Sequence, residues 1–152
     1  MPADITPTAE DRATLDRLWA RGTAFLGTEL AILGGAMSWV SERHLVSAIS
    51  NAGGFGVIAC GSMNPALLRT EIQATRQKTA KPFGVNLITM HPELDQLIQV
   101  CLEEKVGHVV LAGGLHETRA ASSERRGRLG AGIRHGAPAR IIQHRRGGMH
   151  LA

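Results

Sequence analysis

The polar side chain best placed to do chemistry is Asn86, which lies within the otherwise apolar run FGVNLI at residues 83–88. Burying an amide that has no hydrogen-bond partner costs about 1–3 kcal/mol, so we expect another group to bond to it. That group is either a neighbouring strand or helix cap, or a bound ligand at the end of the strand. The residue itself leaves both readings open.

Glycine and small polar residues follow the predicted strands. They occupy residues 34–38, residues 61–64 and the pair Gly113-Gly114. Glycine lets the backbone approach a ligand closely and leaves N–H groups free to donate. The alternative is that these glycines only make tight turns. Their recurrence at three strand ends favours a planar or phosphate-bearing ligand.

Other chemistry is poorly represented. The seven histidines and two cysteines show no metal-ligand spacing, so we predict no metal site. Cys60 and Cys101 are interpreted as buried thiols in a reducing compartment. A loose dinucleotide pattern begins at Gly54, but it enters a strand instead of following one, so we discount it. By residue type, Met37 and Trp39 are more typical of a core than of a cofactor site.

Short apolar strands alternate with amphipathic helices through most of the chain. A helix capped by Thr8 is expected to end at Gly22 or Gly27. Helices are then expected after a Ser41 cap, after Asn64-Pro65 and after His91-Pro92, the last ending before a left-handed Gly107. The predicted strands are residues 30–33, 55–60, 83–89 and 108–112.

This alternation predicts an α/β fold, with a parallel sheet covered by helices. The repeat of roughly 25–30 residues fits either an open doubly wound sheet or a (β/α)8 barrel. Periodicity alone does not choose between the two. In both, ligands gather at the carboxyl ends of the strands, where the glycine-containing loops lie.

Charge divides the chain in two. Residues 1–115 carry nine basic and eleven acidic side chains, whereas residues 116–152 carry eight arginines, two glutamates and no lysine. The net charge of +4 therefore comes from the C-terminal part alone. That part has no aromatic residue for base stacking, so nucleic-acid binding is not favoured. We find no basic-then-apolar leader and no apolar run of membrane-spanning length, and we expect a cytoplasmic protein.

Residues 30–115 resemble the nitronate monooxygenase family, formerly called 2-nitropropane dioxygenase, which includes related flavin-dependent enoyl-ACP reductases. Three segments carry the resemblance most specifically, GAM at residues 35–37, NAGGFG at residues 51–56 and KPFGVN at residues 81–86. The resemblance implies a TIM-type barrel that holds FMN at the carboxyl ends of its strands. About four strands, the N-terminal half of such a barrel, are recognisable.

The resemblance also implies a site and a reaction. Gly35, Ala36 and Met37 would line the flavin, Asn86 would contact it, and the pair Gly113-Gly114 would lie near the substrate. Family members oxidise alkyl nitronates with O2, and the redox chemistry belongs to the flavin. The family places its active-site histidine and phosphate loops in the second half of the barrel. No segment here matches them, so we assign no catalytic residue.

We therefore divide the chain into an N-terminal lead and helix (1–29), a partial flavin-barrel domain (30–115) and a basic tail of low order (116–152). Our hypothesis is that the tail is out-of-frame translation of a GC-rich gene, the alternative being a genuine disordered basic extension. The expected function is an FMN-dependent oxidoreductase that is truncated and impaired. The alternative is a non-catalytic half-barrel fragment that associates with a partner or with itself through open sheet edges.

Overall fold

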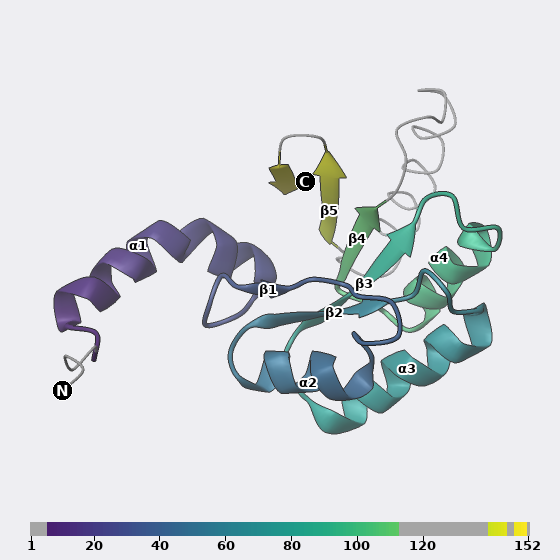
Figure 1. Ribbon diagram of the computed structural model, residues 1–152, viewed down its shortest axis with the longest axis horizontal. Coiled ribbons are helices and arrows are strands. Elements are labelled where there is room, and N and C mark those ends of the chain that lie inside the picture. The colour runs from purple at the N-terminus through teal and green to yellow at the C-terminus, as the bar shows by residue number, and fades with distance from the viewer. Residues whose placement is uncertain (1–5, 113–139, 146–147, 152) are drawn as a thin grey trace.

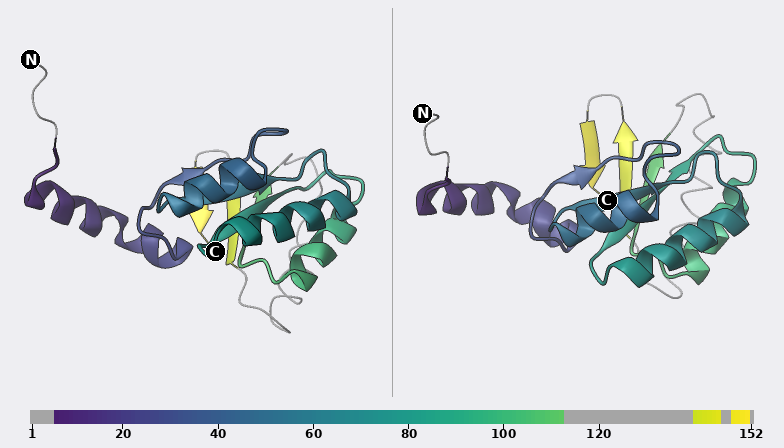
Figure 2. Two further views of the ribbon diagram at one scale, coloured as in Figure 1. Left: turned by 90° about the horizontal axis from the view of Figure 1, so that it is seen from below. Right: turned by 60° about the horizontal axis from the view of Figure 1, so that its bottom comes forward.

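A computed structural model describes residues 6–112, 140–145 and 148–151. Three helices, α2, α3 and α4, lie on one face of a twisted sheet, and α1 projects away from it (Figure 1). The two further views show the same layering (Figure 2). The elements in chain order are α1 (Ala9–Leu26), β1 (Leu33–Gly34), α2 (Arg43–Asn51), β2 (Phe55–Ala59), α3 (Pro65–Lys78), β3 (Phe83–Ile88), α4 (Leu94–Glu103), β4 (His108–Ala112), β5 (Arg140–Arg145) and β6 (Gly148–Leu151).

The sheet follows the order of the sequence, β1 to β6. Strands β1 to β5 pair in parallel, and β6 pairs antiparallel with β5. The register aligns Ala59 of β2 with Asn86 of β3, and Asn86 with Val110 of β4. Parallel neighbours joined by helices on the outer face bring the carboxyl ends of the first four strands to one edge.

The main core lies between the sheet and its helices. It contains Ile58, Val85 and Leu87 from the strands, with Leu68 of α3 and Leu97 of α4, all fully buried. These side chains alternate along each strand with side chains on the opposite, inner face. The main core therefore fixes which strand residues face away from the helices.

A smaller cluster covers the inner face near the amino ends of the strands. Phe55 and Val57 pack there against Leu26, at the end of α1. The ring of His108 lies edge-on to Phe55 at 4.8 Å, and its Nε2 is 2.9 Å from the carbonyl oxygen of Phe25. The end of α1 is thereby attached to the bottom of the sheet.

The predicted alternation of four strands and three helices after α1 is confirmed, with shifted boundaries. The first strand is Leu33–Gly34, not residues 30–33, so the prediction placed it too early in the chain. The apolar residues 30–33 mark the region of the strand, but they do not show which residues pair with β2. Gly27 ends α1 in the left-handed region, at a φ of 71°, as one of the two predicted alternatives required.

Two predicted helix caps were wrong. Glu42, not Ser41, caps α2 by accepting the backbone N–H of His44. After α4 the left-handed residue is Lys105, at a φ of 50°, and not Gly107. In contrast, Asn64 caps α3 through the N–H of Leu67, with Pro65 at its first position, as predicted.

Most of the tail that was predicted to have low order lies outside the described residues. Gly113 and Gly114, which precede the tail, also lie outside them. Within the tail, the described segments are β5 and β6, which add two strands beside β4. No strand was predicted there, because residues 116–152 show no clear apolar periodicity.

Candidate functional site

The candidate site is the edge of the sheet where β1 to β4 end. Its most distinctive part is the loop between β1 and α2, residues 35–42, which we call the β1 loop. Ala36 packs beside the inner-face cluster, whereas Met37 and Trp39 are 51% and 73% exposed. Their assignment to the core from residue type was therefore wrong. Two large apolar side chains are displayed at the end of the sheet where ligands bind in parallel α/β folds.

A buried serine organises the β1 loop. The Ser41 hydroxyl donates to the carbonyl oxygen of Gly35 at 3.0 Å and accepts the backbone N–H of Met37 at 2.9 Å. The carbonyl oxygen of Ser41 accepts the N–H of Ala59, which attaches the loop to the end of β2. The side chain predicted to cap a helix instead closes the loop in front of that helix.

Trp39 has an unfavourable backbone conformation. Its φ is 63°, in the left-handed region, which is sparsely populated by residues with a Cβ and is a genuine outlier for a bulky one. The conformation costs about 1–2 kcal/mol, and the exposed ring recovers little of it by burial. Strain of this kind concentrates at functional sites, which is a physical reason to regard the β1 loop as one.

Asn86 lies on the inner face of β3, near the carboxyl end. Val85 and Leu87 face the helices, so the pleat directs the side chain between them to the other side of the sheet. Asn86 is only 7% exposed, and no hydrogen bond within the described part of the chain involves its carboxamide. Its strand neighbour Ala59 is small. The carboxamide is not among the fully buried polar atoms that lack a partner in the described residues, so it keeps some access to solvent on the inner face, where a ligand could also reach it.

The Asn86 backbone is used differently. Its carbonyl oxygen accepts the Cys60 thiol at a sulfur–oxygen distance of 2.7 Å. Burial raises the pKa of Cys60 to about 12, and burial also raises the pKa of Cys101. Both cysteines are free and buried, as interpreted from the sequence. Cys60 is therefore a structural donor at neutral pH and not a nucleophile.

An ion pair between helices holds the start of α2. The Glu71 carboxylate of α3 accepts the Nε and Nη2 hydrogens of the Arg43 side chain and the Arg43 backbone N–H. Glu71 is only 5% exposed. Burial alone would raise the pKa of this carboxyl, but the hydrogen bonds from Arg43 outweigh burial and lower it. Because α2 begins where the β1 loop ends, the pair also fixes one end of the loop.

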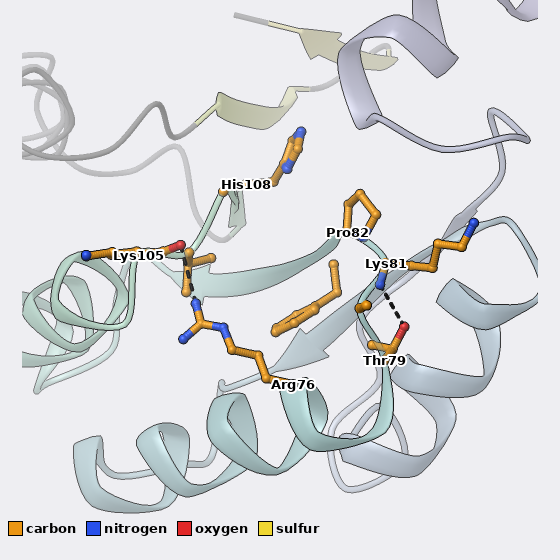
Figure 3. A pocket seen from close by; sticks show the side chains of 10 residues that line it. Arg76, Thr79, Lys81, Pro82, Lys105 and His108 are labelled. Atoms are coloured by element: carbon orange, nitrogen blue, oxygen red, sulfur yellow. Dashed lines mark hydrogen bonds between the residues drawn. The ribbon is translucent and has the colours of Figure 1, made fainter.

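A cavity of about 490 Å³ lies at the opposite, amino end of β3 and β4 (Figure 3). Arg76, Lys81 and Lys105 line it, which suggests an anion site at first sight. However, Arg76 is paired with Glu104, and Lys81 is paired with Glu29 at 2.8 Å. Figure 3 shows Arg76 turned to the backbone oxygen of Lys105. These pairings neutralise most of the charge, so we do not assign the ligand site to this cavity.

The structure places the described residues that the sequence marked toward the carboxyl ends of two strands, β1 and β3, that are separated by β2. Gly35, Ala36 and Met37 form the beginning of the β1 loop, and Asn86 lies on the inner face two strands away. Their role as cofactor contacts remains a prediction. Ser41 and Trp39 were not predicted to matter. Ser41 was interpreted as a helix cap because it directly precedes a predicted helix. The positive φ of Trp39 could not be predicted, because no feature of the sequence indicates it.

Among residues 6–112, no three histidine, cysteine or acidic side chains lie close enough to hold a metal ion. Over the same described residues, no helix combines the length and the apolar character that crossing a membrane requires.

Parallel strands that follow the order of the sequence, with helices on one face, are typical of an α/β barrel-type protein. A family model described as nitronate monooxygenase matches residues 20–119, and the chain belongs to this family. The solved structure of FabK from Thermotoga maritima superposes with a TM-score of 0.69 at 37% identity, over 81% of this chain and 36% of that one. The predicted fold class, the N-terminal half of a TIM-type (β/α)8 barrel, is confirmed.

Two curated relatives illustrate the range of the family. A (3aS,4S,5R,7aS)-5-hydroxy-7a-methyl-1-oxo-octahydro-1H-indene-4-carboxyl-CoA dehydrogenase of Mycobacterium tuberculosis is 33% identical over 84 residues, which are 55% of this chain and 24% of that protein. A nitronate monooxygenase of Paraburkholderia phytofirmans is 39% identical over 67 residues, 44% of this chain and 18% of that protein. The chain thus spans 18–24% of the length of these relatives.

Proposed function

We propose that the chain is an FMN-dependent oxidoreductase of the nitronate monooxygenase type, which oxidises alkyl nitronates with O2 in the cytoplasm. Membership of the family supports this proposal. The observation that carries it is the Asn86 carboxamide, which is almost buried on the inner face and has no hydrogen-bond partner among the described residues. An amide can donate to and accept from the polar edge of a flavin ring.

The residues of the β1 loop fit the same ligand. Gly35 carries no side chain, and a Cβ built there would meet nothing within 4 Å, so its backbone is open to close approach. In the described part of the chain the N–H groups of Gly35 and Ala36 have no hydrogen-bond partner, which leaves two donors at the strand end. We propose that Gly35, Ala36 and Met37 line the flavin.

The flavin, when bound, supplies the electron transfer that no protein side chain can perform. The chain's own contribution is to hold the ring, to orient it and to exclude water from one face. We propose Gly113 and Gly114 as substrate contacts, on the basis of their position after β4 in the sequence. No catalytic residue is assigned, because no segment of the chain matches the one that carries the family's active-site histidine, and the Cys60 thiol stays protonated.

Flavin binding tests the proposal directly. FMN is titrated into the 152-residue chain, and quenching of flavin fluorescence gives Kd. Asn86→Leu should raise Kd by about tenfold, because one hydrogen bond to the flavin is lost. It should not lower the free energy of unfolding, since the amide has no partner to lose. Equal FMN affinity in wild type and Asn86→Leu would contradict the role of Asn86.

Asn51→Ala is the matched control. It removes an amide that donates to the Lys78 carbonyl oxygen and accepts from the Thr79 hydroxyl at the opposite edge of the sheet, so it should lower the free energy of unfolding by about 1 kcal/mol and leave FMN affinity unchanged. If the wild-type chain binds no FMN, the proposed cofactor is wrong for this chain.

Activity assays distinguish two candidate substrates, an alkyl nitronate and an acyl-CoA thioester. Oxygen consumption with an alkyl nitronate is expected at a low rate, because we propose that the chain is truncated and impaired. The relative named as a CoA dehydrogenase, 33% identical, supports an acyl-CoA thioester as the second candidate substrate. Flavin reoxidation or reduction by such a thioester, without turnover of nitronate, would favour that candidate.

The non-catalytic alternative is a half-barrel that associates through its sheet edges. Light scattering would show a dimer or larger assembly, and the chain would turn over neither substrate. A folded monomer would exclude self-association.

A further inference from the structure

The β1 loop needs a restraint, because its conformation is unfavourable by itself. Trp39 is in the left-handed region, and the Met37 and Trp39 side chains are exposed instead of packed. A loop with few apolar contacts and a strained residue opens readily unless hydrogen bonds hold it. The structure therefore poses the question of which group holds the β1 loop closed.

We infer that the Ser41 hydroxyl positions the β1 loop to receive the cofactor. This inference rests on the proposed function. Ser41 is only 3% exposed, and its single oxygen donates to the Gly35 carbonyl oxygen and accepts the Met37 N–H. One side chain thus joins the two residues on either side of Ala36. Ser41 is a positioning residue, because it acts through the backbone of its neighbours.

Backbone bonds complete the closed loop. The carbonyl oxygen of Met37 accepts the N–H groups of Val40 at 3.1 Å and of Ser41 at 2.8 Å. The carbonyl oxygen of Ser41 accepts the Ala59 N–H at 3.0 Å, so the loop is attached to the sheet as well as to itself. This turn places Trp39 at its strained position, and the Ser41 hydroxyl closes it from the other side.

The hydrogen-bond pattern also selects which groups a ligand can use. Ser41 occupies the Gly35 carbonyl and the Met37 N–H. The N–H groups of Gly35 and Ala36 have no partner within the described residues. Two adjacent donors are thus left for the cofactor, while one of the two lone pairs of the Gly35 carbonyl oxygen is already used by Ser41. Loss of the hydroxyl would free the loop and remove this selection.

The test compares Ser41→Ala with Ser47→Ala in the full chain. Ser47 is a matched control, because it is also buried, but its hydroxyl donates only to the His44 carbonyl within α2. The first readout is hydrogen exchange of the Met37 amide without flavin. Ser41→Ala should accelerate it by about tenfold, since its acceptor is lost, and Ser47→Ala should not. Thermal unfolding by circular dichroism shows that both variants fold.

The second readout is the Kd for FMN, obtained from quenching of flavin fluorescence. Ser41→Ala should raise Kd by about tenfold, and Ser47→Ala should leave it unchanged. The inference would be overturned if Ser41→Ala exchanged the Met37 amide at the wild-type rate, or if it bound FMN with the wild-type Kd. A wild-type chain that binds no FMN would overturn the proposed function, and the exchange comparison would still decide whether Ser41 orders the loop.

Discussion

At the scale of single residues, Trp39 combines two costs. Its backbone is in the left-handed region, and its ring is mostly exposed to solvent. Neither is expected of a residue selected only for folding. The neighbouring exposed side chain of Met37 belongs to the same short loop. Trp39 therefore lowers the stability of the fold, which indicates that the residue is there for a purpose other than folding.

The backbone strain at Trp39 can be measured with a pair of variants. Trp39→Gly and Trp39→Ala both remove the ring, and only Trp39→Gly removes the clash of Cβ at positive φ. We expect Trp39→Gly to be more stable than Trp39→Ala by about 1 kcal/mol. At an ordinary helix position glycine is instead the less stable of the two.

Urea unfolding followed by circular dichroism measures both free energies. Ala20, in the middle of α1, provides the control site, where Ala20→Gly should lower the free energy of unfolding. A greater stability of Trp39→Ala over Trp39→Gly would show that the left-handed conformation is not retained.

The sequence predicted some site residues and missed others for identifiable reasons. Asn86 could be proposed from the sequence because burying an amide in an apolar strand costs free energy unless another group bonds to it. Its lack of a partner could not be seen, since that depends on the register with Ala59 and Val110. Ser41 was read as a cap, because a cap and a loop brace use the same residue type in the same place.

At the scale of elements, one ion pair joins α2 to α3. The Glu71 carboxylate accepts from both the side chain and the backbone of Arg43. It therefore satisfies an N–H at the first turn of α2, which has no partner within its own helix. The same carboxylate of α3 thus both holds α2 in place and caps its first turn.

Glu71→Gln should lower the free energy of unfolding by about 2 kcal/mol, because it removes the buried carboxylate and leaves Arg43 with only the more distant Glu42, at 3.9 Å. The control is Glu103→Gln, which breaks the more exposed pair with Arg69 and should have a much smaller effect, because solvent screens that pair. Urea unfolding of the two variants gives the comparison. Similar losses in both would mean that burial of Glu71 adds nothing to the pair.

The same carboxylate predicts a pH dependence. Burial raises the pKa of Glu71, but the Arg43 hydrogen bonds lower it below the ordinary value of 4.5 overall. The unfolded chain then binds the proton more tightly than the folded one, so this contribution is complete above the ordinary pKa and is lost as the pH falls. Between about pH 5 and 3, the unfolding free energy of wild type should fall more steeply than that of Glu71→Gln. Parallel curves would assign the acid sensitivity to other groups.

A second set of ion pairs joins α3 to the end of α4. Glu104 accepts from Arg69 and Arg76, and Glu103 pairs with Arg69. In the sequence, the two glutamates are simply adjacent acidic residues near the end of a predicted helix. Their partners lie some thirty positions earlier in the chain. Local pattern can show that a charge is on the surface, but it cannot show which helix lies opposite.

At the scale of the whole molecule, the two thiols report on the stability of a single core. Cys60 of the strand layer and Cys101 of α4 belong to the same buried cluster. Burial raises the pKa of both, and that of Cys60 reaches about 12. At pH 8 neither is expected to be a thiolate in the folded protein.

Iodoacetamide at pH 8 should therefore label both cysteines slowly and at one common rate, set by global unfolding. Mass spectrometry of the intact chain resolves the unlabelled, singly and doubly labelled species. In urea two labels should be added rapidly. Rapid single labelling of the folded protein would show that one side of the core opens by itself.

The overall architecture was predictable because it depends on period and composition. Fully apolar strands such as Phe55–Ala59 and helices with one apolar stripe specify a covered parallel sheet without reference to distant contacts. The choice of a barrel came from the family resemblance and not from the pattern. Strand β1 was misplaced because pairing, not hydrophobicity, decides which part of residues 30–34 forms the ladder.

Gly56 has a consequence for the height of the β1 loop over the sheet. A Cβ at this position would lie 2.4 Å from the Val46 carbonyl oxygen and 2.9 Å from its Cα, both backbone atoms of α2. Because Gly56 has no side chain, α2 can pack directly against the backbone of β2. A single added methyl would lift the helix, and the loop that leads into it would rise with it. The position offers protein engineers a steric adjustment for the proposed cofactor edge, made at a residue outside the β1 loop.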